Sequence, residues 1–210
     1  TLESNYLGVK NFLEVIEKNK YKTNFFKANS GYIFSSKSGI VSLKSKLSDS
    51  LNPYIKAQIK AFNLIKKFRK KGINCHSIVM LQVESPLRSK HFFVKKVCVK
   101  SKLGEKIEVG NINTVRDYSW ASEIALGIHY FSETNLKDII LSSGVGISGV
   151  EIIDEAYKLR KLNSKKFYKI NQKFLRKKEI KVLIGRDKNI TKLYKKFRWK
   201  PKIFGKLVVR

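Results

Sequence analysis

The sequence predicts an α/β fold whose central sheet is largely parallel. Short apolar runs alternate along the chain with amphipathic stretches of helical period, and turn residues separate the two kinds of segment. The chain has 210 residues and 42% hydrophobic residues, which is enough for a domain with a real core. There is no internal repeat and no flexible linker, so we expect a continuous globular structure.

The first part of the chain alternates helices with strands. Residues 3–18 carry apolar side chains at helical spacing, which predicts a first helix. Residues 23–30 form a short apolar run that ends in small polar residues, which is typical of a buried strand. A second helix is expected over residues 53–68, because its apolar stripe ends shortly before Gly72, a residue that favours a helix end. Residues 73–81 then predict a second strand.

The rest of the chain continues this alternation. Short apolar runs predict strands over residues 107–111, 138–143 and 180–185. Amphipathic spacing predicts helices over residues 120–131, 149–162 and 189–197. Between the two halves, the sequence "ESPLR" at residues 84–88 is expected to be a loop.

The strongest compositional signal is a net charge of +29, from 45 lysine and arginine residues against 16 acidic ones. Such a charge suggests nucleic-acid binding. However, lysine is spread over nearly every segment and accompanies many Asn, Ile, Phe and Tyr residues, as in a protein encoded by AT-rich DNA. The densest runs, at 66–72 and 174–181, fit solvated helix ends. We therefore expect only non-specific contact with polyanions, with nucleic-acid binding as a minor alternative.

The cysteines and the N-terminus exclude several other classes. Cys75 and Cys98 are the only cysteines, no C-x-x-C is present, and no histidine stands at ligand spacing. This argues against a disulfide framework and predicts no metal site. No apolar run has the length of a membrane span, and the first residues lack a signal-peptide pattern, so a cytoplasmic protein without membrane contact is expected. Because it lacks an initiator Met, the chain is expected either to be trimmed or to begin inside a longer protein.

A glycine-rich loop resembles a dinucleotide-binding motif. Gly144, Gly146 and Gly149 follow the pattern G-x-G-x-x-G between a predicted strand and a predicted helix. The acidic residue that a Rossmann loop needs ~20 positions later is missing. Ser148 and Glu151 instead form the pattern S-x-x-E, which is typical of a helix capping box. We therefore interpret the loop as a strand-to-helix turn and not as a cofactor site.

Longer motifs carry a resemblance that covers essentially the whole chain. The most specific are "ESPLR", "GNINTVRDYSWA" at 110–121 and "LRKKEIKVLIGRD" at 175–187, and the chain closes with "WKP" at 199–201. With these motifs the sequence resembles the extended short-chain dehydrogenase/reductase family, and within it the GDP-mannose 4,6-dehydratases. The resemblance implies an N-terminal Rossmann domain that binds NADP and a smaller C-terminal lobe that binds a GDP-sugar.

The same resemblance places the start of this chain after the phosphate loop of the family. We therefore expect a partial Rossmann-like sheet made of the later strands only. Residues 1–88 would form the end of the nucleotide domain, and residues 89–210 a small α/β substrate lobe from which some strands return to the main sheet. A sheet without its first strands would leave an edge unpaired, so a homo-oligomer or a second chain that supplies strands is a possible partner.

The family reaction oxidises the sugar at C4, eliminates water across C5–C6 and returns the hydride to C6, and its catalytic residues are only partly present. Ser30 matches the family hydroxyl residue, which bonds the sugar 4-hydroxyl. Tyr32 stands where the family has the Glu that removes the C5 proton. Tyr54 matches the family Tyr that takes the hydroxyl proton. Gln58 replaces the Lys that lowers the pKa of that Tyr. A phenol is a poor base at neutral pH.

Some of the positions that the resemblance implies for ligand contacts keep the family residue, and others carry a replacement. Arg88 matches a family arginine that contacts the cofactor phosphate, and Val83 replaces a cofactor-contacting His. Four residues match positions near the GDP-sugar, although Lys95 replaces an arginine there: Glu84, Lys95, Arg116 and Arg176. In so basic a chain, Arg116 and Arg176 could also be surface charges, although their place inside longer matching motifs favours a ligand position. Ser30 could be a turn residue, and Tyr54 could be a packing residue.

The sequence therefore predicts a degenerate relative of this family without dehydratase activity, for which NADP binding by this chain alone is doubtful. Two alternatives stay open. The chain could be a noncatalytic partner that binds GDP-mannose or a related GDP-sugar. It could also be active once an N-terminal Rossmann portion is present.

Overall fold

A three-stranded parallel sheet in the order β1-β5-β10 lies at the centre of the fold. The computed structural model describes residues 1–176 and 179–210. Strands β1 (Phe25–Ser30), β5 (Cys75–Met80) and β10 (Asp138–Leu141) all run in the same direction. Strand β5 is central, and its residues are almost entirely buried because both faces of the sheet are covered. The predicted parallel α/β arrangement is confirmed.

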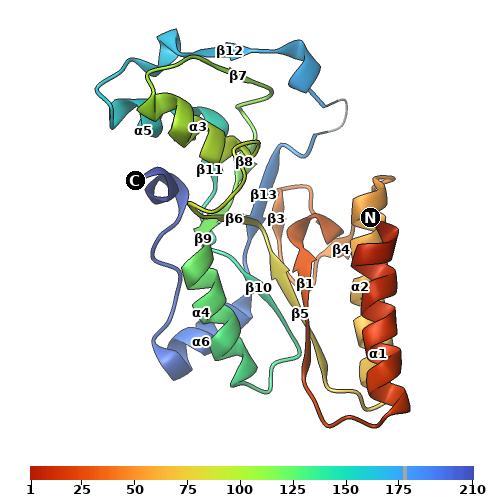
Figure 1. Cartoon of the computed structure of the whole chain (residues 1–210). Coiled ribbons are helices and arrows are strands. Elements are labelled where there is room, and N and C mark those ends of the chain that lie inside the picture. The colour runs from red at the N-terminus through yellow and green to blue at the C-terminus, as the bar shows by residue number, and fades with distance from the viewer. Residues whose placement is uncertain (177–178) are drawn as a thin grey trace.

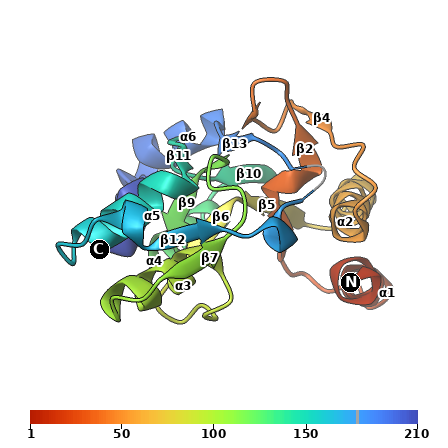
Figure 2. The same ribbon diagram turned by 90° about the horizontal axis from the view of Figure 1, so that it is seen from above.

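Helices cover both faces of this sheet (Figure 1). On one side lie α1 (Gly8–Lys18), which the π-helical turn η1 (Glu3–Leu7) precedes, and α2 (Pro53–Lys70). On the other side, α4 (Ala121–Ser132) and α6 (Lys188–Phe197) pack against β10. Figure 2 shows α1 at the outer edge of the molecule, next to α2. None of the helices in the described part of the chain is long and apolar enough to cross a membrane.

The limits of α2 follow from its terminal residues. The side chain of Asn52 accepts a hydrogen bond from the amide of Tyr54 at 2.9 Å, and Pro53 occupies the first helical turn, where its missing N–H is harmless. Gly72 has a φ of 90°, which residues other than glycine rarely adopt. At this residue the chain turns from α2 toward β5. At the same end, Arg69 forms an ion pair with Asp138 at 2.7 Å, which ties α2 to β10.

A second, mixed sheet has the order β11-β8-β13-β3. Its members are β3 (Ile40–Val41), β8 (Val115–Arg116), β11 (Ile147–Ser148) and β13 (Val182–Gly185). The sequence predicts β13 but not its neighbours, because a two-residue strand shows no periodicity. The pairing of β3 with β13 joins the first part of the chain to the last. The division at residues 88 and 89 stays a prediction.

Three short strand pairs complete the sheet structure: β2 (Phe34–Ser35) with β4 (Lys46–Leu47), β6 (Gln82–Glu84) with β9 (Tyr118–Trp120), and β7 (Ile107–Val109) with β12 (Tyr168–Ile170). The 3₁₀ turns are η2 (Gly31–Ile33), η3 (Ser164–Lys166), η4 (Gln172–Phe174) and η5 (Gly205–Val209). Residue 84 thus ends a strand, and the expected loop starts one residue later.

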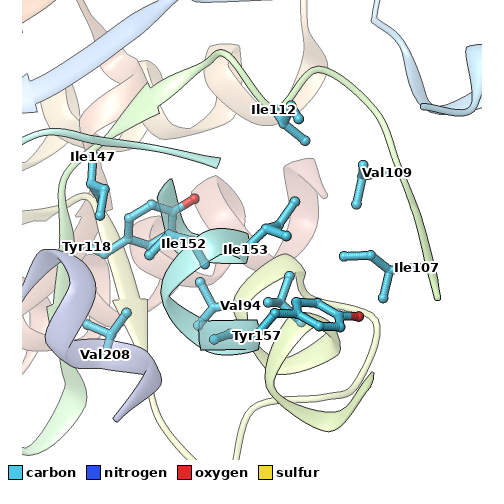
Figure 3. Close-up of a cluster of buried hydrophobic side chains, with 12 residues drawn as sticks. Val94, Ile107, Val109, Ile112, Tyr118, Ile147, Ile152, Ile153, Tyr157 and Val208 are labelled. Carbon is cyan, nitrogen blue, oxygen red and sulfur yellow. The ribbon is translucent and has the colours of Figure 1, made fainter. Parts of the chain in front are cut away.

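A separate hydrophobic core lies between α3 (Phe93–Lys102), α5 (Gly149–Lys158) and β7 (Figure 3). Its centre is Tyr157, whose ring is fully buried and whose hydroxyl donates to the carbonyl of Glu105 at 2.6 Å. Helix α5 begins with the predicted capping box, since Ser148 and Glu151 bond each other's backbone amides. The predicted helix over 149–162 is confirmed in type but ends at Lys158.

A close contact joins α4 to the C-terminal segment. The ring of Trp199 lies over Gly127, where an added Cβ would be 2.4 Å from the ring. Trp199 is 7% exposed and packs in a core cluster with Leu193 and Phe131. Glycine at position 127 is therefore required for the approach of the "WKP" segment to α4.

Candidate functional site

The candidate residues gather where the parallel strands end. Ser30 is the last residue of β1, and Tyr32 lies in the 3₁₀ turn that follows. Strand β6, which carries Gln82 and Glu84, comes directly after β5. In open α/β sheets, ligands bind outside the carboxyl ends of the strands. The candidate residues therefore lie at the edge of the sheet where this fold class binds ligands.

Tyr32 lies at the centre of a polar network. Its hydroxyl accepts a hydrogen bond from Nε of Arg116 at 3.2 Å and lies 3.4 Å from Nε2 of Gln82. The hydroxyl of Ser30 accepts the amide of Tyr32 at 3.3 Å and so caps the turn. The structure thus brings together Ser30, Tyr32 and Arg116, and it adds Gln82, which sequence reasoning missed.

The guanidinium of Arg116 is used largely within the protein. The residue is 6% exposed. Its two terminal nitrogens donate to the carbonyls of Val115 at 2.8 Å, Ile180 at 2.7 Å and Lys181 at 3.3 Å. These bonds hold the start of β13 against β8. The predicted contact of Arg116 with a GDP-sugar stays a prediction, and such a contact would compete with these bonds.

Tyr54 and Gln58 lie one turn apart on α2. The ring of Tyr54 is 41% exposed, whereas Gln58 is 4% exposed. The amide of Gln58 donates to Oδ1 of Asn5 at 2.8 Å and accepts from Nζ of Lys27 at 3.4 Å. Burial lowers the pKa of the Lys27 ammonium. Sequence reasoning missed Lys27 and Asn5, because only the fold brings η1, β1 and α2 together.

Glu84 is the buried carboxylate of the site. It is 4% exposed, and its Oε1 accepts from Nη1 of Arg88. Its Oε2 has no hydrogen-bond partner among the described residues. Burial raises the pKa of Glu84 to about 7, although Arg88 opposes the shift. Arg88 also lies over the ring of Phe92, with 3.8 Å from the guanidinium carbon to the ring centroid.

Two further predicted ligand residues lie at the surface. Nζ of Lys95, on α3, donates to the carbonyl of Pro86 at 2.8 Å. Arg176 is exposed, and no hydrogen bond within the described part of the chain joins it to the other candidates. The basic run at 174–181 that contains it includes residues 177–178, which lie outside the described residues.

A second buried carboxylate, Asp117, accepts hydrogen bonds from the backbone of the glycine-rich loop. It is fully buried and accepts the amides of Ser143 at 3.0 Å, Gly144 at 2.9 Å and Gly185 at 3.3 Å. The hydroxyl of Ser143 adds a bond at 2.6 Å. Burial raises the pKa of Asp117, and these hydrogen bonds oppose the rise. Although Asp117 belongs to the quoted motif at 110–121, only the fold reveals this role.

The loop around Gly144 therefore does not fit a cofactor diphosphate. A phosphate-binding loop must direct free amides at the anion, but these amides already face the carboxylate of Asp117. At Gly146, an added Cβ would lie 2.5 Å from the side chain of Ile184, so that glycine serves packing. No other glycine-rich turn between a strand and a helix occurs among the described residues.

A surface hollow of about 910 Å³ lies at the other end of the sheet. It is lined by the turn between α1 and β1, including Lys20 and Tyr21, and by the turn between α2 and β5, including Lys71. These turns precede the strands, whereas Ser30 and Glu84 follow them. The hollow is thus remote from the candidate residues and adds nothing to their chemistry.

Comparison with known proteins places this geometry in context. A family model described as GDP-mannose 4,6 dehydratase matches residues 1–210. A GDP-mannose 4,6-dehydratase from Sordaria araneosa is 23% identical over 76% of this chain and 31% of its own length. GDP-mannose 4,6 dehydratase 2 of Arabidopsis thaliana is 26% identical over 62% of this chain and 36% of its own length. The chain thus spans about a third of the curated relatives it matches.

A solved structure shows the same fold. The crystal structure of a dTDP-glucose 4,6-dehydratase from Bacillus anthracis, in complex with NAD, superposes with a TM-score of 0.86. The superposition covers 99% of this chain and 66% of the other, with 14% sequence identity. At this identity the likeness establishes the α/β fold alone.

Proposed function

The chain belongs to the GDP-mannose 4,6-dehydratase family, and we propose that it is a sugar-nucleotide-binding member that does not catalyse the dehydration by itself. Family membership indicates a function of the sugar-nucleotide dehydratase and epimerase type. Dehydration of a GDP-hexose requires a group that oxidises the sugar hydroxyl and a base that removes a proton beside the new carbonyl. The residues at these two positions support the proposal.

The observation that carries the proposal is the environment of Tyr32. The resemblance predicts a carboxylate base at this position. Here a phenol hydroxyl stands instead, and it accepts from the guanidinium of Arg116 at 3.2 Å. A phenol hydroxyl is a poorer general base than a carboxylate for the removal of a carbon-bound proton.

The surroundings of Gln58 support the same conclusion. The resemblance predicts an ammonium at this position, one turn after Tyr54, to favour the phenolate. A neutral amide stands there, bonded to Asn5 at 2.8 Å. The nearby ammonium of Lys27 contacts the amide of Gln58 and the carbonyl of Ala28. Its burial disfavours the charged form that would stabilise a phenolate.

The direct test is an activity assay. The purified chain, incubated with GDP-mannose and NADP, should give no 4-keto sugar above the background without protein, whereas an active family member run in parallel should. A Tyr32→Glu/Gln58→Lys variant asks whether these two positions alone block the reaction. Formation of 4-keto product by the unmodified chain, and its loss in Tyr32→Phe, would defeat the proposal.

Binding of a GDP-sugar is favoured by Glu84. Its Oε2 is buried without a donor among the described residues, and a sugar hydroxyl is a suitable donor for it. Calorimetry with GDP-mannose should therefore detect binding that weakens roughly tenfold or more in Glu84→Gln, the loss of a hydrogen bond to a charged group. The matched control is Glu133→Gln at an exposed carboxylate, which should bind unchanged. Equal affinities in all three proteins would remove Glu84 from the site.

The edge of β1 favours a second candidate, activity after completion by further strands. Strand β1 pairs with β5 on one side, and the described residues supply no strand for its other side. An unpaired parallel edge accepts a further strand. We propose that such a strand, from the same protein or from a partner, completes the nucleotide half. Co-expression with the N-terminal half of a family member should then give a stable complex, and failure to co-purify would count against this candidate.

A further inference from the structure

Basic side chains cover the exposed side of α6 and of the segment that follows it. The spacing of Lys188, Lys192 and Lys195 places them on one face of the helix. The opposite face, with Ile190 and Leu193, packs into the core. All basic side chains of residues 188–202 are exposed, and no acidic residue occurs among them: Lys188, Lys192, Lys195, Lys196, Arg198, Lys200 and Lys202. We call this set the α6 surface.

The cations of the α6 surface have no acidic partners within residues 1–176 and 179–210. Ion pairs do occur elsewhere in the chain, for example Lys71 with Glu17 at 2.7 Å and Arg69 with Asp138 at 2.7 Å. None of the ion pairs formed by the described residues includes a cation of the α6 surface. No ion pair in the described part of the chain therefore compensates the positive charge of this surface.

The two carboxylates next to this surface bond backbone amides. Asp187 accepts the amides of Ile140 at 2.8 Å and Asn189 at 3.1 Å, and so caps α6. Glu123 accepts the amides of Lys202 and Ile203. These carboxylates fix the ends of the segment, and the side chains of its cations are exposed. Nζ of Lys196 also donates to the carbonyl of Glu133 at 2.6 Å.

An aromatic ring lies among the cations. Tyr194 is 40% exposed, and Nζ of Lys200 lies 5.7 Å from its ring centroid. Behind it, Phe197 stacks on Tyr130 with 4.7 Å between centroids. Because α6 is anchored through this stack and through the buried Leu193, the surface is preformed. Cations that track phosphates beside an aromatic ring that stacks on a base are the features of single-strand binding sites.

We propose that the α6 surface binds single-stranded nucleic acid, with its lysines on the phosphates and Tyr194 stacked on a base. This function goes beyond the binding of a sugar nucleotide and uses residues outside the site described above. A membrane surface fits less well. An amphipathic helix needs free apolar side chains to enter a bilayer, but Ile190 and Leu193 are packed inside the protein.

The test is the anisotropy of a fluorescent oligo-dT titrated with the whole chain at several salt concentrations. The variant Lys192→Gln/Lys195→Gln/Lys196→Gln should weaken binding roughly tenfold and reduce the slope of log affinity against log salt by about 2. The matched control is Lys165→Gln/Lys166→Gln/Lys169→Gln, which removes the same charge from exposed positions near β12. It should change affinity less than about threefold.

A second pair of variants tests the stacking ring. Tyr194→Ala should weaken oligo-dT binding about fivefold or more, whereas Tyr21→Ala, which removes a more exposed tyrosine elsewhere, should leave it unchanged. Circular dichroism spectra and melting curves confirm that each variant is folded. The proposal is overturned if the two lysine variants lose affinity equally, if the unmodified chain binds no oligonucleotide, or if it prefers vesicles of anionic lipid to oligo-dT at equal phosphate.

Discussion

Two buried carboxylates lie in different regions of the molecule and have opposite surroundings. Asp117, between β8 and β9, accepts hydrogen bonds from Ser143, Gly144 and Gly185, so that both of its oxygens are satisfied. Glu84, at the end of β6, is paired with Arg88 through one oxygen, and its other oxygen has no partner among the described residues. Both side chains are almost completely buried.

The two carboxylates therefore differ in how completely the protein satisfies their hydrogen-bonding capacity. Asp117 joins the ends of β10 and β13 to the β8–β9 connection, and it leaves no donor or acceptor for a ligand. Glu84 keeps one acceptor atom unused at the carboxyl end of the sheet. A buried polar atom without a partner is costly, so Glu84 contributes less to stability than Asp117.

Removal of Asp117 should have the largest effect. In Asp117→Ala three backbone amides lose their acceptor inside the protein, which predicts a loss of about 3–5 kcal/mol in the free energy of unfolding. Urea titration followed by circular dichroism measures this loss. Asp117→Asn keeps one acceptor oxygen and should lose less. A loss below about 1 kcal/mol for Asp117→Ala would show that the comparison overstates the role of this carboxylate.

Glu84 should give a smaller effect that depends on pH. Its pKa is raised from the ordinary 4.5 to about 7, so between these values the folded protein holds a proton that the unfolded chain releases. The free energy of unfolding should therefore fall by roughly 1–3 kcal/mol as the pH rises from 4.5 to 8.

Urea titrations across this pH range, on the unmodified chain and on Glu84→Gln, measure the dependence. The slope should be clearly smaller in Glu84→Gln, because position 84 no longer titrates. The raised pKa of Asp117 and of Asp187 contributes a residual slope of the same sign in both proteins. Equal slopes would mean that Glu84 titrates at its ordinary value.

The smallest effect is expected at an exposed carboxylate. Glu151 and Ser148 form the capping box of α5. Hydrogen bonds from Ser148 lower the pKa of Glu151. Ser148→Ala should reduce the free energy of unfolding by about 1 kcal/mol, measured as a shift of the urea midpoint. Ser132→Ala, at the end of α4, serves as a comparison without a capping role. If Ser148→Ala lost as much free energy of unfolding as Asp117→Ala, the size of the effects would not follow the burial of the carboxylates.

The sequence predicts the long elements well, and the reasons are local. The start of α2 at Pro53, its end near Gly72 and the capping box at Ser148 depend on residues a few positions apart. Strands β5 and β10 contain apolar runs because both faces of their sheet are covered, whereas β1 is mostly half-buried and its apolar residues lie at its start. Patterns of this kind are visible without knowledge of the fold.

The remaining elements depend on contacts between distant segments. Helix α3 escapes prediction because its valines and phenylalanines resemble a strand, and it is helical where Val94 and Val97 pack against α5. In the candidate site, the positions of Tyr32 and Gln58 could be predicted by resemblance. The resemblance also names Arg116, but its contact with Tyr32, like that of Lys27 with Gln58, is seen only in the folded chain.

The contact of Trp199 with Gly127 has a consequence for mechanical behaviour. Because no space remains for even one methyl group, α4 and the end of α6 cannot slide past each other, and they should move as one rigid block. One added carbon at position 127 would therefore force the Trp199 ring away from the middle of α4.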